Sequence, residues 1–176
     1  MDEARTGCYG RAMSILPILR YPDPRLAQPC AAVGEVTDDI RRLAGDMLET
    51  MYAAPGRGLA APQVGVLLRL FVMDVAGKDG APEPLVFVNP EIVEASGGMA
   101  SRAEGCLSIP GLMVEVARPE AVRMRWTGLD GAERQAWFAG IAATCAQHES
   151  DHLDGVLTLD RIAPEARAAA LAEYAG

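Results

Sequence analysis

The first regular pattern of apolar positions along the chain predicts a helix that begins near Asp38. Its apolar residues recur every three or four positions, which is the period of one buried helix face. They are Ile40, Leu43, Met47, Leu48 and Met51. Thr37 is a suitable N-cap, because its hydroxyl can accept a hydrogen bond from the first turn. We expect these methionines to lie in the core.

Between residues 66 and 138, short apolar runs bounded by turn residues predict strands. The runs cover residues 66–74, 85–90, 114–116, 121–126 and 134–138, and Pro90 is expected to end the second. An Asp-Gly pair within Leu129–Ala132 predicts a hairpin between the last two. From about Ile141 the pattern becomes helical again until Gly155, and Pro164 opens a short final helix. Strands followed by a late helix, without regular alternation, indicate an α+β domain.

The ends of the chain differ in character. Residues 1–12 are polar and show no period, and Met13 stands directly before the apolar start of the pattern. We expect residues 1–12 to be a disordered extension, or Met13 to be the true start. Residues 13–176 are expected to form a single domain, a length that can bury a substantial core.

Composition excludes several classes of protein. The formal net charge of −8 disfavours nucleic acid as the main partner. No apolar run approaches the roughly 18 residues of a membrane span, and the N-terminus does not resemble a secretory signal. The four cysteines, Cys8, Cys30, Cys106 and Cys145, form no C-x-x-C pair. We therefore expect reduced thiols and a cytoplasmic location.

The histidines carry the clearest chemical signal. The chain has two, His148 and His152, in the pattern H-E-x-x-H. Residues four apart lie on one face of a helix, where two imidazoles can bind one metal ion, with Glu149 beside them as a proton acceptor. The alternative is a pair of surface histidines on a polar helix, because so short a motif can arise by chance.

A catalytic metal site needs a third protein ligand. The metzincin pattern would place a histidine where this chain has Thr158, so that reading fails. A thermolysin-like site would use a glutamate near Glu173, which lies at the end of the chain. Cys145 shares a similar helix face with His148, and Cys106 follows Gly105 in a strand-like segment. Both cysteines therefore remain candidates, although a lone cysteine is usually a small buried hydrophobe.

The segment Gly56–Gly65 superficially matches the dinucleotide pattern G-x-G-x-x-A. That pattern must follow a strand and open a helix, whereas this segment follows a helix, contains Pro62 and leads into a strand. We interpret it as a loop of small residues that can lie against a ligand. Gln63 is its only amide side chain, and the alternative for Gln63 is a surface loop residue.

Taken in order, three motifs resemble those of the peptide deformylase family. They are G-x-G-x-A-A-x-Q at Gly56–Gln63, E-G-C-x-S at Glu104–Ser108, and H-E-x-x-H within Gln147–Gly155. The similarity spans about residues 13–162. It implies antiparallel sheets packed around a central helix that carries H-E-x-x-H. It also implies metal-dependent removal of the formyl group from N-formylmethionyl nascent peptides, which releases formate.

The resemblance also implies roles for individual residues. Cys106, His148 and His152 would bind one divalent metal ion, which is Fe²⁺ in the family and replaceable by Zn²⁺, Ni²⁺ or Co²⁺. Glu149 would be the general base and acid, and Gln63 with the backbone N–H of Leu107 would form the oxyanion hole. Gly58 and Gly105 would hold the substrate as an added strand, and Cys145 would line the pocket for its methionine side chain.

Two features depart from the family. Met113 replaces an arginine that many members carry near the substrate. Some members also have a longer, basic C-terminal helix suited to transient contact with the ribosome, whereas the charges after Arg161 are few and balanced. The alternatives to deformylation are a zinc peptidase of the H-E-x-x-H type, or a deformylase-like domain retained only to bind peptide or metal.

Overall fold

The computed structural model describes residues 14–77 and 80–175. Within these ranges, seven strands form two sheets, and every pairing between named strands is antiparallel. Together with three α-helices this confirms the α+β class. The expected extension at residues 1–12 lies outside the described residues. None of the helices within the described ranges has the length and apolar character needed to cross a bilayer.

The larger sheet has the strand order β1-β2-β3-β6-β7, and the smaller pairs β4 with β5. The strands of the larger sheet are β1 (Gly58–Ala60), β2 (Leu70–Met73), β3 (Leu85–Ala95), β6 (Ala121–Thr127) and β7 (Glu133–Ala139). Those of the smaller sheet are β4 (Met99–Cys106) and β5 (Ile109–Pro119). The hairpin predicted around Asp130-Gly131 is confirmed, because Thr127 pairs with Glu133 and Gly131 takes a positive φ of 80°.

The helices begin and end close to the predicted positions. They are α1 (Asp38–Ala53), α2 (Gly140–Leu153) and α3 (Pro164–Ala175), with short 3-10 turns η1 (Pro24–Ala27), η2 (Ala61–Val64) and η3 (Thr158–Asp160). The Thr37 side chain accepts a hydrogen bond from the Ile40 N–H at 3.4 Å, as its capping role requires. Met47 and Met51 are fully buried.

Three predictions about strands were wrong. The segment read as a loop after α1 contains the short strand β1, which pairs with β2. The run at residues 66–74 forms a strand only over Leu70–Met73. Pro90 does not end β3, since the strand continues to Ala95 through an irregular register beside Asn89, whose φ is 49°. A proline lacks an N–H and is tolerated within a sheet at such a bulge.

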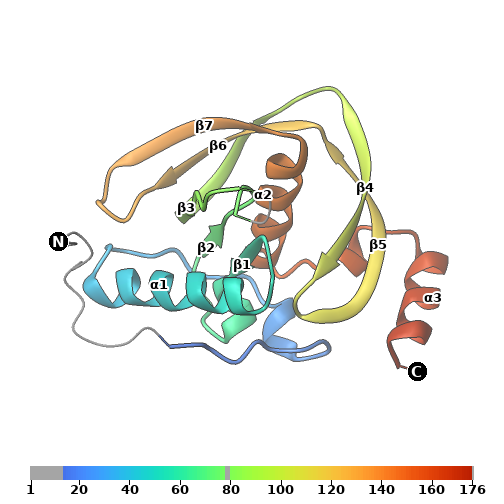
Figure 1. Cartoon of the computed structure of the whole chain (residues 1–176). Coiled ribbons are helices and arrows are strands. Elements are labelled where there is room, and N and C mark those ends of the chain that lie inside the picture. Colours follow the sequence, from blue (N-terminus) through green and yellow to red (C-terminus); the bar gives the residue numbers. More distant parts are fainter. Residues whose placement is uncertain (1–13, 78–79, 176) are drawn as a thin grey trace.

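Two apolar cores meet at β2. Phe71 and Met73 face a core with α2, Phe87 and Trp126, while Leu70 and Val72 face a core with α1. Both faces of β2 are therefore covered, which explains why its sequence is continuously apolar. A third core joins the β4–β5 hairpin to α3. Figure 1 shows α2 between the strands of the larger sheet and this hairpin.

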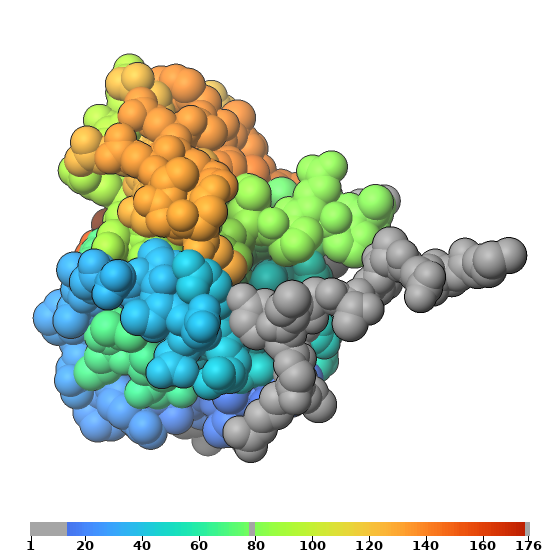
Figure 2. Space-filling view, turned by 90° about the vertical axis from the view of Figure 1, so that its left-hand side faces the viewer, coloured from blue at the N-terminus to red at the C-terminus, as the bar shows by residue number. Residues whose placement is uncertain are grey.

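The far end of the β6–β7 hairpin rests on α1. The Arg41 Nε–H donates a hydrogen bond to the Leu129 carbonyl oxygen at 3.1 Å. In Figure 2 the hairpin lies directly above α1 on the face toward the viewer. The sheet, α1 and α2 thus form a continuous framework around β1, and β1 leads into the segment that carries Gln63.

Candidate metal centre

The two histidines lie on the buried face of α2. His148 is 9% exposed and His152 is 1% exposed, so the alternative of two surface histidines is wrong. Their Nε2 atoms approach each other to 3.2 Å, as side chains four residues apart on a helix can do. The Nε2 atoms of the two rings therefore point to the same place.

Cys106 completes this group from the end of β4. Its Sγ lies 3.4 Å from His152 Nε2, and the three ligand atoms all lie within 4.8 Å of one another. Cys145 does not belong to the group and packs against the core around α2 instead. Neither Thr158 nor Glu173 belongs to it. One thiolate and two imidazoles are a donor set that suits a transition-metal ion and leaves room for further ligands.

The electrostatic surroundings of Cys106 favour the thiolate form of its side chain. Burial raises the pKa of its thiol, but the positive charge of His152 and hydrogen bonds from both histidines lower it more. The resulting pKa is well below the ordinary value for a thiol. Burial instead raises the pKa of Cys145 well above that value. Because the thiolate is the form that binds metals, Cys106 is the cysteine suited to ligation.

Glu104 orients His148 from behind. Its Oε2 lies 3.0 Å from His148 Nδ1. Burial raises the pKa of Glu104, yet hydrogen bonds to His148 and Arg118 lower it more, and the net shift is downward. An ionised carboxylate can only accept, so this contact places a hydrogen on His148 Nδ1 and turns Nε2 toward the other two ligand atoms.

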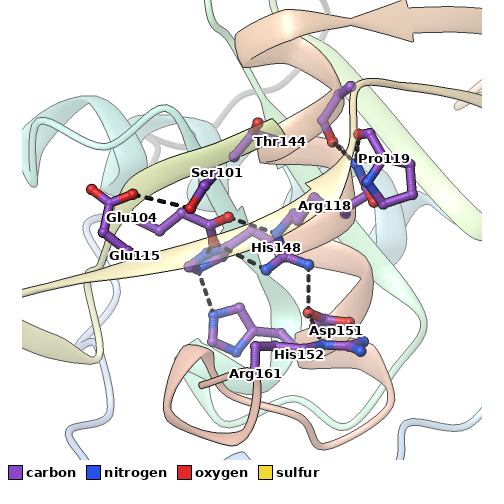
Figure 3. A network of polar contacts seen from close by, with 12 residues as sticks. Ser101, Glu104, Glu115, Arg118, Pro119, Thr144, His148, Asp151, His152 and Arg161 are labelled. Carbon is purple, nitrogen blue, oxygen red and sulfur yellow. Dashed lines mark hydrogen bonds and ion pairs between the residues drawn. The ribbon is translucent and has the colours of Figure 1, made fainter. Parts of the chain in front are cut away.

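Glu104 is itself the inner end of a buried ionic network (Figure 3). Arg118 donates to both oxygens of Glu104 at 2.6 and 3.0 Å, and to Asp151 Oδ2 at 2.9 Å. Asp151 also pairs with Arg161, whose Nε lies 3.0 Å from Oδ2. Two guanidinium groups, that of buried Arg118 and that of the more exposed Arg161, thus balance two buried carboxylates.

Glu149 lies beside the three ligand atoms. It is 4% exposed, and its Oε2 has no hydrogen-bond partner among the described residues. Burial raises its pKa, against the opposing effect of the two histidines. A β-carbon on Gly58 would lie 2.8 Å from the Glu149 Cγ, so the backbone of β1 can pass here only as glycine. The site thus contains a buried carboxylate with one oxygen, Oε2, that no described residue pairs.

Gln63 reaches the same place from η2. Its Oε1 accepts a hydrogen bond from the Ala60 N–H at 2.9 Å, which turns its amide NH₂ toward Ser108 Oγ at 3.1 Å and Cys106 Sγ at 3.7 Å. Gln63 is 1% exposed, so the alternative of a surface loop residue is wrong. Leu107 follows Cys106 in the two-residue turn between β4 and β5.

A cavity of about 910 Å³ opens onto this group. Gly58, Gln63, Gly105, Leu107, Cys145 and Glu149 all line it. Strands β1 and β4 each stand at an edge of their sheet and face the cavity through Gly58 and Gly105. The structure therefore brings these residues to one cavity together with Cys106 and His148, while His152 lies behind them, fully buried.

Sequence reasoning missed the residues that support the site. Arg118 occupies an inward position of β5, continuing the alternation of Leu112, Val114 and Val116. A charged residue at an apolar position of such a pattern is a signal of a buried ion pair. Asp151 lies on the same turn of α2 as the histidines, but no spacing in the sequence identifies Arg118 as its partner.

Comparisons with known proteins agree with this geometry. A family model described as polypeptide deformylase matches residues 15–168. A peptide deformylase of Alkalilimnicola ehrlichii is 55% identical over 84% of this chain and 82% of its own length. One of Rhodopseudomonas palustris is 48% identical over 92% of this chain and 94% of its own length.

Solved structures give the same result. A peptide deformylase of Synechococcus elongatus, in complex with actinonin, superposes with a TM-score of 0.87 at 40% identity, covering 91% of this chain and 88% of that one. The enzyme of Legionella pneumophila gives 0.86 at 40% identity, covering 92% and 94%. With the family model matching most of its length, the chain belongs to the polypeptide deformylase family.

Proposed function

We propose that this protein hydrolyses the N-formyl group of formylmethionyl peptides, with Cys106, His148 and His152 holding one divalent metal ion. The observation that carries the proposal is the convergence of three ligand atoms within 4.8 Å of one another, beside the unpartnered Glu149 Oε2. When bound there, the ion would serve as a Lewis acid that makes water more acidic and polarises the formyl carbonyl.

Glu149 would move the proton. Its buried carboxylate takes a proton from the attacking water, whose oxygen forms the new bond to the formyl carbon. Glu149 then gives a proton to the peptide nitrogen as the C–N bond breaks, which yields formate and a free amine. The upward shift of its pKa supports this role, since a base with a pKa nearer neutrality also becomes an effective acid.

Gln63 and the Leu107 N–H would stabilise the negative charge that develops on the formyl oxygen. The hydrogen bond from the Ala60 N–H fixes the orientation of the Gln63 amide, so its NH₂ faces Ser108 and Cys106, beside the proposed site of reaction. One such donor typically contributes about 3 kcal/mol to the transition state.

The peptide would bind as an added strand between β1 and β4. Both are edge strands that line the cavity, and Gly58 and Gly105 leave their backbones open to a third chain. The side chain of the first residue would point toward Cys145 on α2. The Met113 sulfur would lie 2.8 Å from a β-carbon on Gly105, so an exposed apolar side chain stands where the next residues would pass.

We further propose Fe²⁺ as the native metal and the cytoplasm as the location. A ligand set of one thiolate and two imidazoles suits Fe²⁺, Zn²⁺, Ni²⁺ and Co²⁺, so the choice of Fe²⁺ rests on the family resemblance. The described cysteines, Cys30, Cys106 and Cys145, are free, which supports a reducing compartment. Elemental analysis of protein purified without oxygen tests the metal.

The function is tested by formate release from formyl-Met-Ala-Ser, with acetyl-Met-Ala-Ser and a longer unformylated peptide as controls. We expect formate from the first peptide and no cleavage of internal peptide bonds. Cleavage of the unformylated peptide would favour the zinc peptidase. Binding of metal and peptide without any formate would favour the retired binding module.

A further inference from the structure

Arg102 is an unexpected residue in the cavity wall. It lies on β4, is half-buried and lines the cavity. Most arginines of the chain pair with an acidic side chain, as Arg118 does with Glu104. Among the described residues, Arg102 makes no recorded ion pair or hydrogen bond. A guanidinium group in this position has five N–H donors and no acceptor of its own.

The packing of β4 along α2 shows which part of the cavity Arg102 faces. Cys106 contacts His152, and Glu104, two residues earlier, contacts His148, one helical turn earlier. Two residues of a strand advance about 6.6 Å, and four residues of a helix advance about 6 Å. Two further residues back along β4 and one further turn back along α2, Arg102 therefore lies opposite Thr144. Both residues line the cavity.

This end of the cavity is the part expected to take the first side chain of the substrate. Ile141, Thr144 and Cys145 line it from α2, next to His148. The Thr144 hydroxyl donates to the Gly140 carbonyl oxygen at 3.2 Å, so its hydrogen is already used. Apart from the weak S–H donor of Cys145, the donors of Arg102 are consequently the ones on this wall without a partner among the described residues.

We propose that Arg102 makes this subsite accept a first residue whose side chain carries an oxygen acceptor at or near its end, as glutamate and methionine sulfoxide do. The inference rests on the proposed deformylase function and deepens it. An entirely apolar subsite would remove water from such an oxygen without replacing its hydrogen bonds. The Arg102 guanidinium replaces those bonds, and a charged donor makes them stronger than a neutral one would.

The experiment compares three formyl peptides that differ only in the first residue: norleucine, methionine sulfoxide and glutamate, each followed by Ala-Ser. Norleucine has the length of methionine and no acceptor. For each enzyme, kcat/KM of the two oxygen-bearing peptides is divided by that of the norleucine peptide. This ratio cancels differences in metal content and in the fraction of active protein.

In Arg102→Met, both ratios are expected to fall about tenfold, which corresponds to about 1.4 kcal/mol. Arg102→Lys should retain most of the ratio for glutamate, because it keeps the charge. Arg102→Gln is a second neutral variant that keeps the polarity. The two oxygen-bearing peptides distinguish a charged acceptor from a neutral one. Raised ionic strength should lower the kcat/KM ratio for glutamate and leave the ratio for methionine sulfoxide unchanged.

Arg20→Met is the matched control. Arg20 also lines the cavity but lies at the other end of β4, because the Tyr21 N–H donates to the Ser108 carbonyl oxygen, beyond Cys106. The kcat/KM ratios of Arg20→Met should equal those of the wild type. Equal ratios in the wild type, Arg102→Met and Arg102→Gln would overturn the inference. Absence of formate from all three peptides with the wild type would instead contradict the proposed function.

Discussion

Replacement of Arg118 by methionine removes the centre of the ionic network behind the metal centre. Arg118 is 5% exposed and joins Glu104 to Asp151 through three hydrogen bonds. Methionine has a similar length but carries no charge. Asp151 keeps its pairing with Arg161, whereas Glu104 retains only His148. The variant therefore leaves one buried carboxylate without its main countercharge.

The expected loss of stability follows from the loss of the positive charge that Arg118 places beside Glu104. Removing one partner of a buried ion pair destabilises a protein by about 3–5 kcal/mol. Asp151 remains paired and the new side chain fills much of the volume, so we expect about 3 kcal/mol. For a chain of this size each kcal/mol lowers the melting temperature by about 2–4 °C, which predicts a decrease of about 10 °C.

Metal binding should weaken as well. Glu104 holds the His148 ring through Nδ1, and loss of such an orienting contact typically lowers metal affinity by about 10–100-fold. Urea unfolding of the metal-free protein measures the stability change without a contribution from bound metal. Transfer of Zn²⁺ to a chromogenic chelator measures the affinity.

The control is Arg125→Met, which removes an exposed ion pair with Glu91 at 2.5 Å. Its unfolding curve should match that of the wild type, because exposed ion pairs contribute little. If Arg118→Met unfolded at the wild-type urea concentration and kept its zinc affinity, the network would not support the metal centre and the reasoning would be refuted.

Three further predictions concern the proposed roles. Cys106→Ala should lose the metal and Cys145→Ala should keep it; a full complement of metal in Cys106→Ala, by elemental analysis after anaerobic preparation, would contradict the ligand assignment. Glu149→Ala should retain metal but lose about 10²–10⁴-fold in kcat, the usual range for a positioned acid–base group; near-normal turnover of the fully metallated variant would exclude the mechanism. A chain that starts at Met13 should keep its melting temperature and turnover, and a large decrease in either would show that residues 1–12 pack onto the domain.

Much of the fold followed from local patterns. The stripe from Ile40 to Met51 and the Thr37 cap predicted α1, and the Asp130-Gly131 turn predicted the β6–β7 hairpin. Such features depend on residues close in the chain, so the sequence displays them directly. β1 was missed because its three residues are a strand only through pairing with β2. The continuation of β3 past Pro90 depends likewise on a bulge opposite β6.

The sequence by itself determined which residue types could perform the chemistry, because H-E-x-x-H needs only the spacing of one helix. It left Cys106 and Cys145 open as the third ligand until the family motifs were considered. Only the tertiary structure brings the Cys106 sulfur to 3.4 Å from His152 and turns Cys145 into the cavity wall. The same holds for Arg118, which meets Glu104 across the hairpin and Asp151 across the space to α2. These contacts join residues 14 and 33 positions apart in the sequence. A local sequence pattern cannot predict them, because they form only when the hairpin packs against the helix.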